Sequence, residues 1–362
     1  MSSKDKMDDW IKHLRMHGFA IIPDILDKDE CKSLIQEVGK FWEKRGVKLD
    51  DKSTWRDIYK YYPNHGMLFQ HYVGHMQGIW NVRSNKNVVN VFDKIWGPGQ
   101  KTVSFDGMSL GFKPEETNRG WHIKDWYHLD QSPNDSTFKC VQGWVSPLKV
   151  EEGDATLTVL KDSHLKHSDF CNHYDLKIKP EDSTKVKASK RANWYKLTQD
   201  QVEWYRDNGC ETVNIVCPAG SMVVWDSRTV HAGRGALKNR QNPKNRIVVY
   251  VCMLPDTLTD AQRNKKIKAI CENRTTTHWP VKSKLFAKHP RTYGGDLPPD
   301  IPFEPPLLTR EGAKLAGFKG YSPFLEKDPE KRCIKIKELL KKIEYDKKKS
   351  TGKRIEEKLK RL

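Results

Sequence analysis

The apolar residues of this chain follow a helical spacing first and a strand spacing later. Residues 1–100 carry them mostly three or four positions apart, as amphipathic helices do. The exception is a continuous apolar run at 19–23, which predicts a short strand. Asp27 and Glu30 have the spacing of a capping box and predict the start of the next helix, and residues 86–97 predict a further one. We therefore expect a helical N-terminal region that packs on the rest of the chain.

Beyond residue 100 the apolar residues form short runs that are typical of strands. The runs are rich in β-branched and aromatic residues and are separated by Gly, Pro, Asn and Asp, at 102–112, 137–145, 155–160, 212–216, 221–225 and 246–254. Because no regular crossover helices separate them, an antiparallel sandwich or barrel is favoured. We therefore expect a mainly β core over residues 101–255 with flanking helices.

Two segments fall outside this strand pattern. Residues 161–210 are polar and rich in lysine, with one helical stretch at 198–208, and predict an insertion between strands. Long insertions of this kind often serve as lids or binding loops. Residues 256–362 predict a helical and irregular C-terminal extension. Its end, 327–362, is a basic tail in which Lys, Arg and Glu alternate with Ile and Leu.

Composition limits the class of protein. Apolar residues make up 36% of the 362 residues and 12 of them are Trp, which is enough for a sizeable core. The eight cysteines contain no C-x-x-C pair, and we expect reduced thiols. The N-terminus lacks the apolar core of a targeting signal, and no apolar run reaches the length of a membrane span. These features predict an intracellular, cytoplasmic protein without a transmembrane segment.

The charge of the chain is positive and unevenly distributed. The formal net charge is +18, and the basic tail holds 15 Lys and Arg against 7 Asp and Glu. Such a balance favours anionic partners, which include small anions, nucleic acid and acidic surfaces. A solvated helix is the commoner role of a basic tail, and no nucleic-acid-binding signature is present.

The segment Trp126-Tyr-His128-Leu-Asp130 offers metal ligands. On a strand, residues two apart point to the same face, so the side chains of His128 and Asp130 can reach one point. A third ligand is expected from His231, where the apolar run at 220–231 ends in a tight segment. Two imidazoles and one carboxylate form the facial triad of non-haem Fe(II) oxygenases, which leaves positions open for a cosubstrate and O₂. A lone H-x-D pair is also common on surface loops, so the context of His231 decides in favour of a metal site.

Arg246 opens an apolar strand soon after His231 and is predicted to anchor the cosubstrate. A guanidinium at the start of a buried strand needs an anionic partner, and its planar fork fits a carboxylate. The far carboxylate of 2-oxoglutarate would fit this position. A surface arginine that flanks a strand is the alternative, and Arg240, Lys238 and Lys244 are rivals that do not open the strand.

These segments resemble the phytanoyl-CoA dioxygenase family of 2-oxoglutarate oxygenases over about residues 7–255. The shared motifs are Gly18-Phe-Ala-Ile-Ile-Pro23 with the following Asp-Glu-Cys31, the pair His128-Leu-Asp130, the Ser-His segment Glu151-Glu-Gly-Asp-Ala-Thr-Leu-Thr-Val-Leu-Lys-Asp-Ser163-His164, and the distal ligand strand at 220–231. Two departures stand out. Lys161-Asp162 replaces the family's Pro-Gly, and the gap between His231 and Arg246 is longer than the family's.

The resemblance implies a double-stranded β-helix, Fe(II), 2-oxoglutarate and O₂, and a hydroxylation that releases succinate and CO₂. It implies the same three metal ligands, His128, Asp130 and His231. Related halogenases carry a small residue at the carboxylate position, so Asp130 favours hydroxylation. The family position equivalent to Trp144 walls the 2-oxoglutarate pocket, although core packing is an equal alternative here.

Three further residues have open roles. His164 is expected to support the site without binding metal. His122 either lines the substrate entrance or is a partly buried structural histidine. Arg83 either binds an anionic group of the substrate or is a surface or helix-capping residue.

The predicted function is hydroxylation of an unactivated C–H bond in a small molecule, and the positive charge favours an anion. One alternative is the same chemistry on a protein or nucleic acid that residues 161–210 and the basic tail would dock. Another is a non-catalytic barrel that acts as a binding protein. The sequence specifies neither the substrate nor an oligomeric state.

Overall fold

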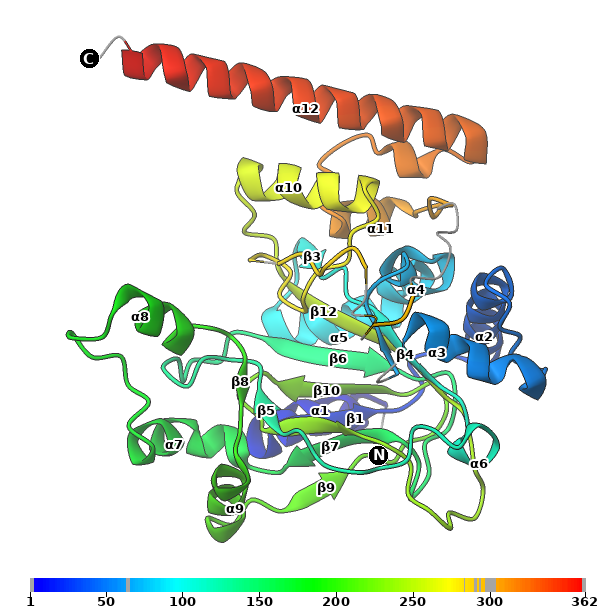
Figure 1. Ribbon diagram of the computed structural model, residues 1–362, viewed down its shortest axis with the longest axis vertical. Coiled ribbons are helices and arrows are strands. Elements are labelled where there is room, and N and C mark those ends of the chain that lie inside the picture. Colours follow the sequence, from blue (N-terminus) through cyan, green and yellow to red (C-terminus); the bar gives the residue numbers. More distant parts are fainter. Residues whose placement is uncertain are drawn as a thin grey trace.

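Two antiparallel sheets form the centre of the protein (Figure 1). The computed structural model describes residues 3–62, 66–282, 284–289, 292, 294–296 and 304–359. The larger sheet contains β1 (Phe19–Ile22), β10 (Met222–Asp226), β6 (Val141–Val145), β12 (Arg246–Pro255), β4 (Met108–Gly111), β2 (Met67–Leu68) and β3 (Lys101–Val103). The smaller sheet contains β8 (Tyr195–Lys196), β5 (His128–Leu129), β11 (His231–Arg234), β7 (Thr156–Leu160) and β9 (Thr212–Asn214).

One apolar cluster fills the space between the two sheets. Trp144 of β6, Trp225 of β10 and Val248 of β12 come from the larger sheet. Leu157 and Val159 of β7 come from the smaller one and pack against them. Side chains alternate along each strand, so every second residue points into this interior. The expected double-stranded β-helix with flanking helices is confirmed.

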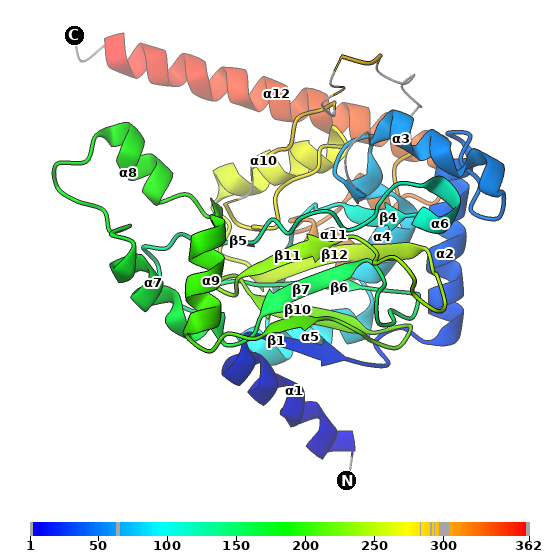
Figure 2. The same ribbon diagram turned by 60° about the horizontal axis from the view of Figure 1, so that its bottom comes forward.

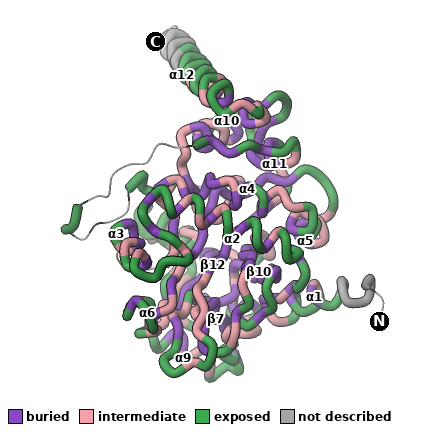
Figure 3. The backbone as a smooth tube through the Cα atoms, turned by 90° about the vertical axis from the view of Figure 1, so that its right-hand side faces the viewer, coloured by how far each residue is buried: buried purple, intermediate pink, exposed green. Residues whose placement is uncertain are grey.

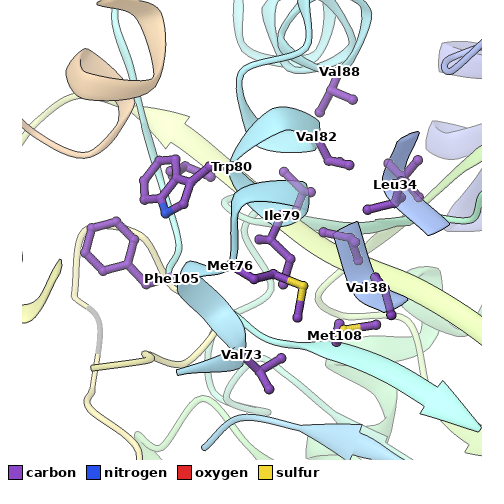
Figure 4. Packing of buried hydrophobic residues seen from close by; sticks show 14 of the residues in the cluster. Leu34, Val38, Val73, Met76, Ile79, Trp80, Val82, Val88, Phe105 and Met108 are labelled. Atoms are coloured by element: carbon purple, nitrogen blue, oxygen red, sulfur yellow. The ribbon is translucent and has the colours of Figure 1, made fainter. Parts of the chain in front are cut away.

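A second apolar cluster covers the other face of the larger sheet. Figure 4 shows Leu34 and Val38 of α2 beside Ile79 and Val82 of α4, with Met108 of β4 in the same cluster. The helices of this half are α1 (Ser3–His17), α2 (Lys28–Glu43), η1 (Lys52–Asp57), α3 (Ile58–Tyr61), η2 (Val73–His75), α4 (Gln77–Arg83), α5 (Lys86–Trp96) and α6 (Pro114–Thr117). The predicted capping box of α2 is confirmed, because Asp27 and Glu30 each accept the backbone N–H of the other.

The insertion between β7 and β9 is mainly helical. It contains η3 (Ser163–Lys166), α7 (His167–His173), α8 (Thr184–Lys190), the short β8 and α9 (Gln199–Asp207), which gather at one end of the sheets (Figure 2). β8 pairs with β5, the strand that carries His128. The insertion therefore extends the sheet that carries the candidate metal ligands.

The C-terminal extension lies on the helical side of the larger sheet (Figure 1). It contains α10 (Asp260–Cys271), α11 (Arg310–Leu315), η4 (Pro323–Leu325) and α12 (Pro329–Leu359). Figure 1 shows α10 between α12 and the sheets, and Figure 3 shows that α12 projects outward with mostly exposed residues. The expected basic helix is present, and residues 360–362 of the tail lie outside the described residues. No helix in the described part of the chain is long and apolar enough to span a membrane.

The expected single strand over residues 102–112 is wrong, because the chain forms β3 and β4 with a break between them. At the break Phe105 bonds to the C-terminal extension. Its N–H donates to the Thr276 hydroxyl at 3.0 Å, and its carbonyl accepts the Thr276 N–H at 2.9 Å. A partner 171 positions away therefore takes the backbone groups of Phe105, while Ser104 and Gly107 still bond to β12, and alternation of residue types does not reveal such a partner.

Candidate active site

The three predicted metal ligands converge between β5 and β11. His128 and His231 are directly opposite each other in the register of these strands, and Asp130 follows β5 by one residue. The Asp130 Oδ2 atom lies 3.3 Å from His231 Nε2 and 3.7 Å from His128 Nε2. All three side chains are buried, and one ligand atom from each lies within 4.8 Å of the others. This group can therefore hold one metal ion.

Backbone carbonyls orient both imidazoles. His128 Nδ1 lies 3.1 Å from the Trp126 carbonyl, and His231 Nδ1 lies 2.9 Å from the Thr229 carbonyl. Since a carbonyl only accepts, each Nδ1 carries a proton, and each Nε2 is the atom that faces Asp130 and that can bind a metal once it is deprotonated. Metal–nitrogen bonds are about 2.0–2.1 Å long, so adjacent ligand atoms lie about 3 Å apart. Two imidazoles and one carboxylate in this arrangement fit Fe(II).

The charges at the site favour the ligand forms of these groups. Burial alone would raise the pKa of Asp130, but the imidazoles of His278 and His128 hold that pKa well below its usual range. Burial lowers the pKa of His231, and the neighbouring His128 lowers it further, while Asp130 opposes both. Asp130 is therefore ionised and His231 neutral near pH 7, which are the states that bind a metal.

The Ser-His segment holds the chain just before His231. The Ser163 hydroxyl accepts the Val230 N–H at 2.9 Å, and His164 Nε2 lies 2.9 Å from the Arg15 carbonyl. Asp162, which replaces the family's glycine, has φ +68° and takes the left-handed conformation itself. Its Oδ1 lies 2.7 Å from His17 Nδ1, which stabilises this turn. His164 thus has the expected structural place, away from the metal ligands.

Two residues that the sequence did not single out contact the metal ligands. Gln142 of β6 donates from Nε2 to Asp130 Oδ2 at 2.8 Å. Trp126 stacks on His128, with ring centroids 4.4 Å apart and 11° between the planes, and donates from Nε1 to the Gly233 carbonyl at 3.0 Å. In the sequence, the role of Gln142 could have been suspected because a glutamine interrupts the otherwise apolar stretch at 141–145. The position of Trp126, two residues before His128, was the signal for the stacking.

Replacing Gln142 by leucine is expected to weaken metal binding by about 10- to 100-fold, the usual effect of losing a group that orients a ligand. The leucine removes the donor to Asp130 and keeps most of the volume. Calorimetric titration with Mn(II), which substitutes for Fe(II) without oxidising, measures the change. Gln201→Leu is the control, because Gln201 is also buried but bonds to Tyr195 in the insertion. Unchanged affinity in Gln142→Leu would contradict the assignment.

Arg246 begins β12 and is partly buried. Its Nη1 donates to the Ala155 carbonyl at 2.7 Å, and its Cζ lies 5.7 Å from the Trp144 ring. Burial lowers the pKa of Arg246, and the Tyr250 hydroxyl opposes this shift. No ion pair links Arg246 to an Asp or Glu among the described residues. A partly buried guanidinium without an acidic partner can donate hydrogen bonds to a ligand carboxylate.

Two of the rival cations already have anionic partners. Arg240 contacts Glu115 at 2.8 Å and also pairs with Asp154. Lys244 pairs with Glu151. Because their positive charges are already balanced, Arg240 and Lys244 are poorer anchors for a cosubstrate carboxylate than Arg246.

Trp144 lies in the interior of the β-helix. It is 1% exposed and belongs to the cluster between the two sheets. The Arg246 Cζ atom lies 5.7 Å from the centre of its ring, so a carboxylate bound to Arg246 would lie near Trp144. Contact between Trp144 and the cosubstrate stays a prediction.

A cavity of about 710 Å³ extends from Arg246 and Tyr250 to the surface. Its wall includes Trp126, which stacks on His128. His122 also lines this cavity, which agrees with the first of the two roles considered for it. The metal ligands themselves are not part of this wall. Trp126 thus connects the cavity to the metal site.

Arg83 is not among the residues that line this cavity. Both predictions for it, a substrate-binding residue and a surface or helix-capping residue, were wrong. The side chain is fully buried, and it donates to the carbonyls of Gly74 and Asp106 at 2.6 Å each. Burial lowers its pKa to about 9. Arg83 therefore has a structural role between α4 and the break before β4.

His278 is a further histidine near the metal ligands, and it belongs to the C-terminal extension. Its Nε2 atom is buried and has no hydrogen-bond partner among the described residues. Burial lowers the pKa of His278, while the charge of Asp130 raises it. No spacing in the sequence connects position 278 with His128 or His231, so only the fold could reveal this proximity.

The sequence model of the phytanoyl-CoA dioxygenase (PhyH) family matches residues 14–240. The chain belongs to this family. The match contains all three candidate ligands, and it confirms the resemblance drawn from the sequence. The protein is therefore a non-haem iron dioxygenase that depends on 2-oxoglutarate.

Relatives of this dioxygenase include Ava biosynthesis cluster protein O from Aspergillus versicolor. It is 25% identical over 254 residues, which cover 70% of this chain and 79% of that protein. Among solved structures, the hypothetical protein JW0805 from Escherichia coli at high pH has a TM-score of 0.53 at 11% identity, over 88% of this chain and 82% of that one. The putative oxidoreductase from Salmonella typhimurium LT2 has a TM-score of 0.51 at 13% identity, over 88% and 83%. At these identities the two structures show a shared fold alone.

Proposed function

We propose that this dioxygenase hydroxylates a C–H bond of a small organic molecule. Its iron would be held by His128, Asp130 and His231. The observation that carries the proposal is the buried convergence of His128 Nε2, His231 Nε2 and Asp130 Oδ2 within 4.8 Å. A carboxylate at position 130 fills the coordination position that halogenases leave for chloride, which favours hydroxylation.

The chain's own residues prepare the site for these ligands. The carbonyls of Trp126 and Thr229 fix the imidazoles, and Gln142 fixes the carboxylate. Arg246 would bind the far carboxylate of 2-oxoglutarate as a bidentate partner. When bound, iron and 2-oxoglutarate supply the oxidising chemistry. In the balanced reaction, O₂, 2-oxoglutarate and substrate C–H give succinate, CO₂ and substrate C–OH.

The position of the basic tail supports a small substrate over a polymer. The cavity of about 710 Å³ is in the range of small-molecule sites, which is about 300–1,000 Å³. The described residues of its wall include none from α12, and α10 lies between α12 and the sheets (Figure 1). A polymer docked on α12 would therefore contact residues other than those that form the described cavity wall.

An ¹⁸O₂ experiment tests the reaction type. The purified protein is screened against small organic acids and amides with Fe(II), ascorbate and 2-oxoglutarate, and succinate formation is followed. With a substrate that stimulates succinate formation, we expect one ¹⁸O atom in succinate and one in the product. Products without ¹⁸O, as in desaturation or epimerisation, would contradict hydroxylation. Absence of 2-oxoglutarate-dependent oxidation across the screen and absence of Mn(II) binding would together contradict the proposed site.

A further inference from the structure

Trp194, in the insertion, is an exposed tryptophan beside a metal ligand. Its ring centroid lies 6.2 Å from that of His128, with 40° between the planes. The side chain is 53% exposed, whereas the other tryptophans among the described residues are buried or partly buried. An apolar ring in water gains free energy when a ligand covers it. An exposed indole next to a metal ligand is therefore a candidate contact for a substrate.

The pairing of β8 with β5 places Trp194 on the face of the metal ligands. Lys196 lies opposite His128 and Tyr195 lies opposite Leu129, and Trp194 directly precedes β8. Side chains two apart along a strand share a face, and so do side chains that lie directly opposite each other. The side chain of Trp194 therefore shares the face of His128, and a diagonal neighbour of this kind is within reach of an aromatic ring.

The other face of these two strands is packed against the insertion. Leu129 belongs to an apolar cluster that includes residues of α7 and α9, and Tyr195 packs against this cluster. Trp194 and His128 are not among the residues of the cluster. The packing thus agrees with the alternation along both strands, and the indole lies on the side of the metal ligands.

Hydrogen bonds hold the backbone just before Trp194. The Asn193 side chain accepts the Ser132 N–H at 3.2 Å, and the Lys190 carbonyl accepts the Ser132 hydroxyl at 2.5 Å. Ser132 follows the ligand Asp130 by two residues, so these bonds tie the insertion to the segment that carries a metal ligand. Because the backbone is anchored, a ligand that stacks on the indole has to immobilise only the side chain.

We propose that Trp194 contacts the substrate, and that the substrate carries a flat apolar ring. This ring stacks on the exposed indole beside His128. Trp194 is not among the described residues of the cavity wall that includes Arg246, so the ring does not compete with the cosubstrate carboxylate for that arginine. The inference rests on the proposed function and adds the chemical class of its substrate.

Two amides with the same carbon skeleton test this contact. 2-Naphthamide is flat, and its decahydro derivative is puckered and has the larger apolar surface, so hydrophobic burial alone would favour the puckered probe. Both are neutral, which excludes an attraction to the exposed Lys196. Their binding to the protein loaded with Mn(II) and saturating 2-oxoglutarate is measured by NMR. Broadening of the probe's proton signals by Mn(II) shows whether it binds beside the metal.

For the wild-type protein we expect 2-naphthamide to bind at least about threefold more tightly than the puckered probe, as stacking between aromatic rings allows. Its ring protons should be broadened by Mn(II). In Trp194→Ala, or in Trp194→Gln if the alanine variant does not fold, the preference and the broadening should disappear. Mn(II) and 2-oxoglutarate affinities should stay unchanged.

A conservative variant and a control complete the test. Trp194→Phe retains an aromatic face and should keep part of the preference. Leu165→Ala removes another exposed apolar side chain of the insertion and should keep all of it. The inference is overturned if the wild-type protein does not prefer the flat probe, if Mn(II) does not broaden that probe, or if the preference survives the loss of the indole. Failure of the wild-type protein to bind Mn(II) would instead count against the proposed function.

Discussion

Alanine in place of His128 or His231 is expected to abolish metal binding and succinate formation together. Each change would remove one of the three proposed ligands from a buried site, and the remaining pair cannot define a facial triad. Loss of a residue that merely orients a ligand costs about 10- to 100-fold in metal affinity, so loss of the ligand should cost more than about 100-fold. Calorimetry with Mn(II) measures the affinity. Succinate formation with and without substrate measures coupled and uncoupled turnover.

His122→Ala is the matched control for these variants. His122 lines the cavity but lies outside the cluster of ligand atoms, so its loss should leave Mn(II) affinity unchanged. Circular dichroism and the thermal unfolding midpoint establish that each variant folds. Wild-type turnover in both His128→Ala and His231→Ala would refute the assignment of the metal site.

Methionine in place of Arg246 is expected to weaken 2-oxoglutarate binding by at least about 30-fold. Truncating one partner of a buried, hydrogen-bonded charge pair usually costs about 2–5 kcal/mol, and about 1.4 kcal/mol corresponds to a factor of ten. Methionine keeps a long apolar side chain beside Trp144 but offers no donor to a carboxylate. Titration of the Mn(II)-loaded protein with 2-oxoglutarate measures the change, and Mn(II) affinity itself should stay the same.

Lys244→Gln separates Arg246 from its nearest rival in the sequence. Lys244 already pairs with Glu151, so its loss should not change 2-oxoglutarate affinity. The opposite pattern, weak binding in Lys244→Gln and normal binding in Arg246→Met, would move the anchor to Lys244. Equal losses in both variants would indicate a general effect of positive charge, and they would also contradict a specific role for Arg246.

Local rules allowed much of this fold to be predicted from the sequence. The capping box of Asp27 and Glu30 depends on residues three positions apart, and it forms as expected. The shared face of His128 and Asp130 follows from strand geometry alone. The insertion was recognised because its polar, lysine-rich composition interrupts a series of strands.

Residues whose partners are distant in the sequence were missed or misjudged. Arg83 had the appearance of a site or surface residue, yet the carbonyls of Gly74 and Asp106 hold it in the core. Gln142 and His278 gained their places near Asp130 from strand packing and from the C-terminal extension. No periodicity or spacing relates these positions, so no pattern could have joined them.

The sequence by itself determined the chemistry of the site, because the metal donors have to be histidine and carboxylate and their alternation on a strand is a local property. It also determined the β-rich class, since hydrophobic spacing sets which face of each element is buried. Only the tertiary structure decided that Asp162 could take the place of glycine, that Trp126 stacks on His128, and that Trp194 stays exposed beside the same ligand. The physical reason is that side-chain partners depend on which elements pack together, and long-range packing is a property of the whole fold.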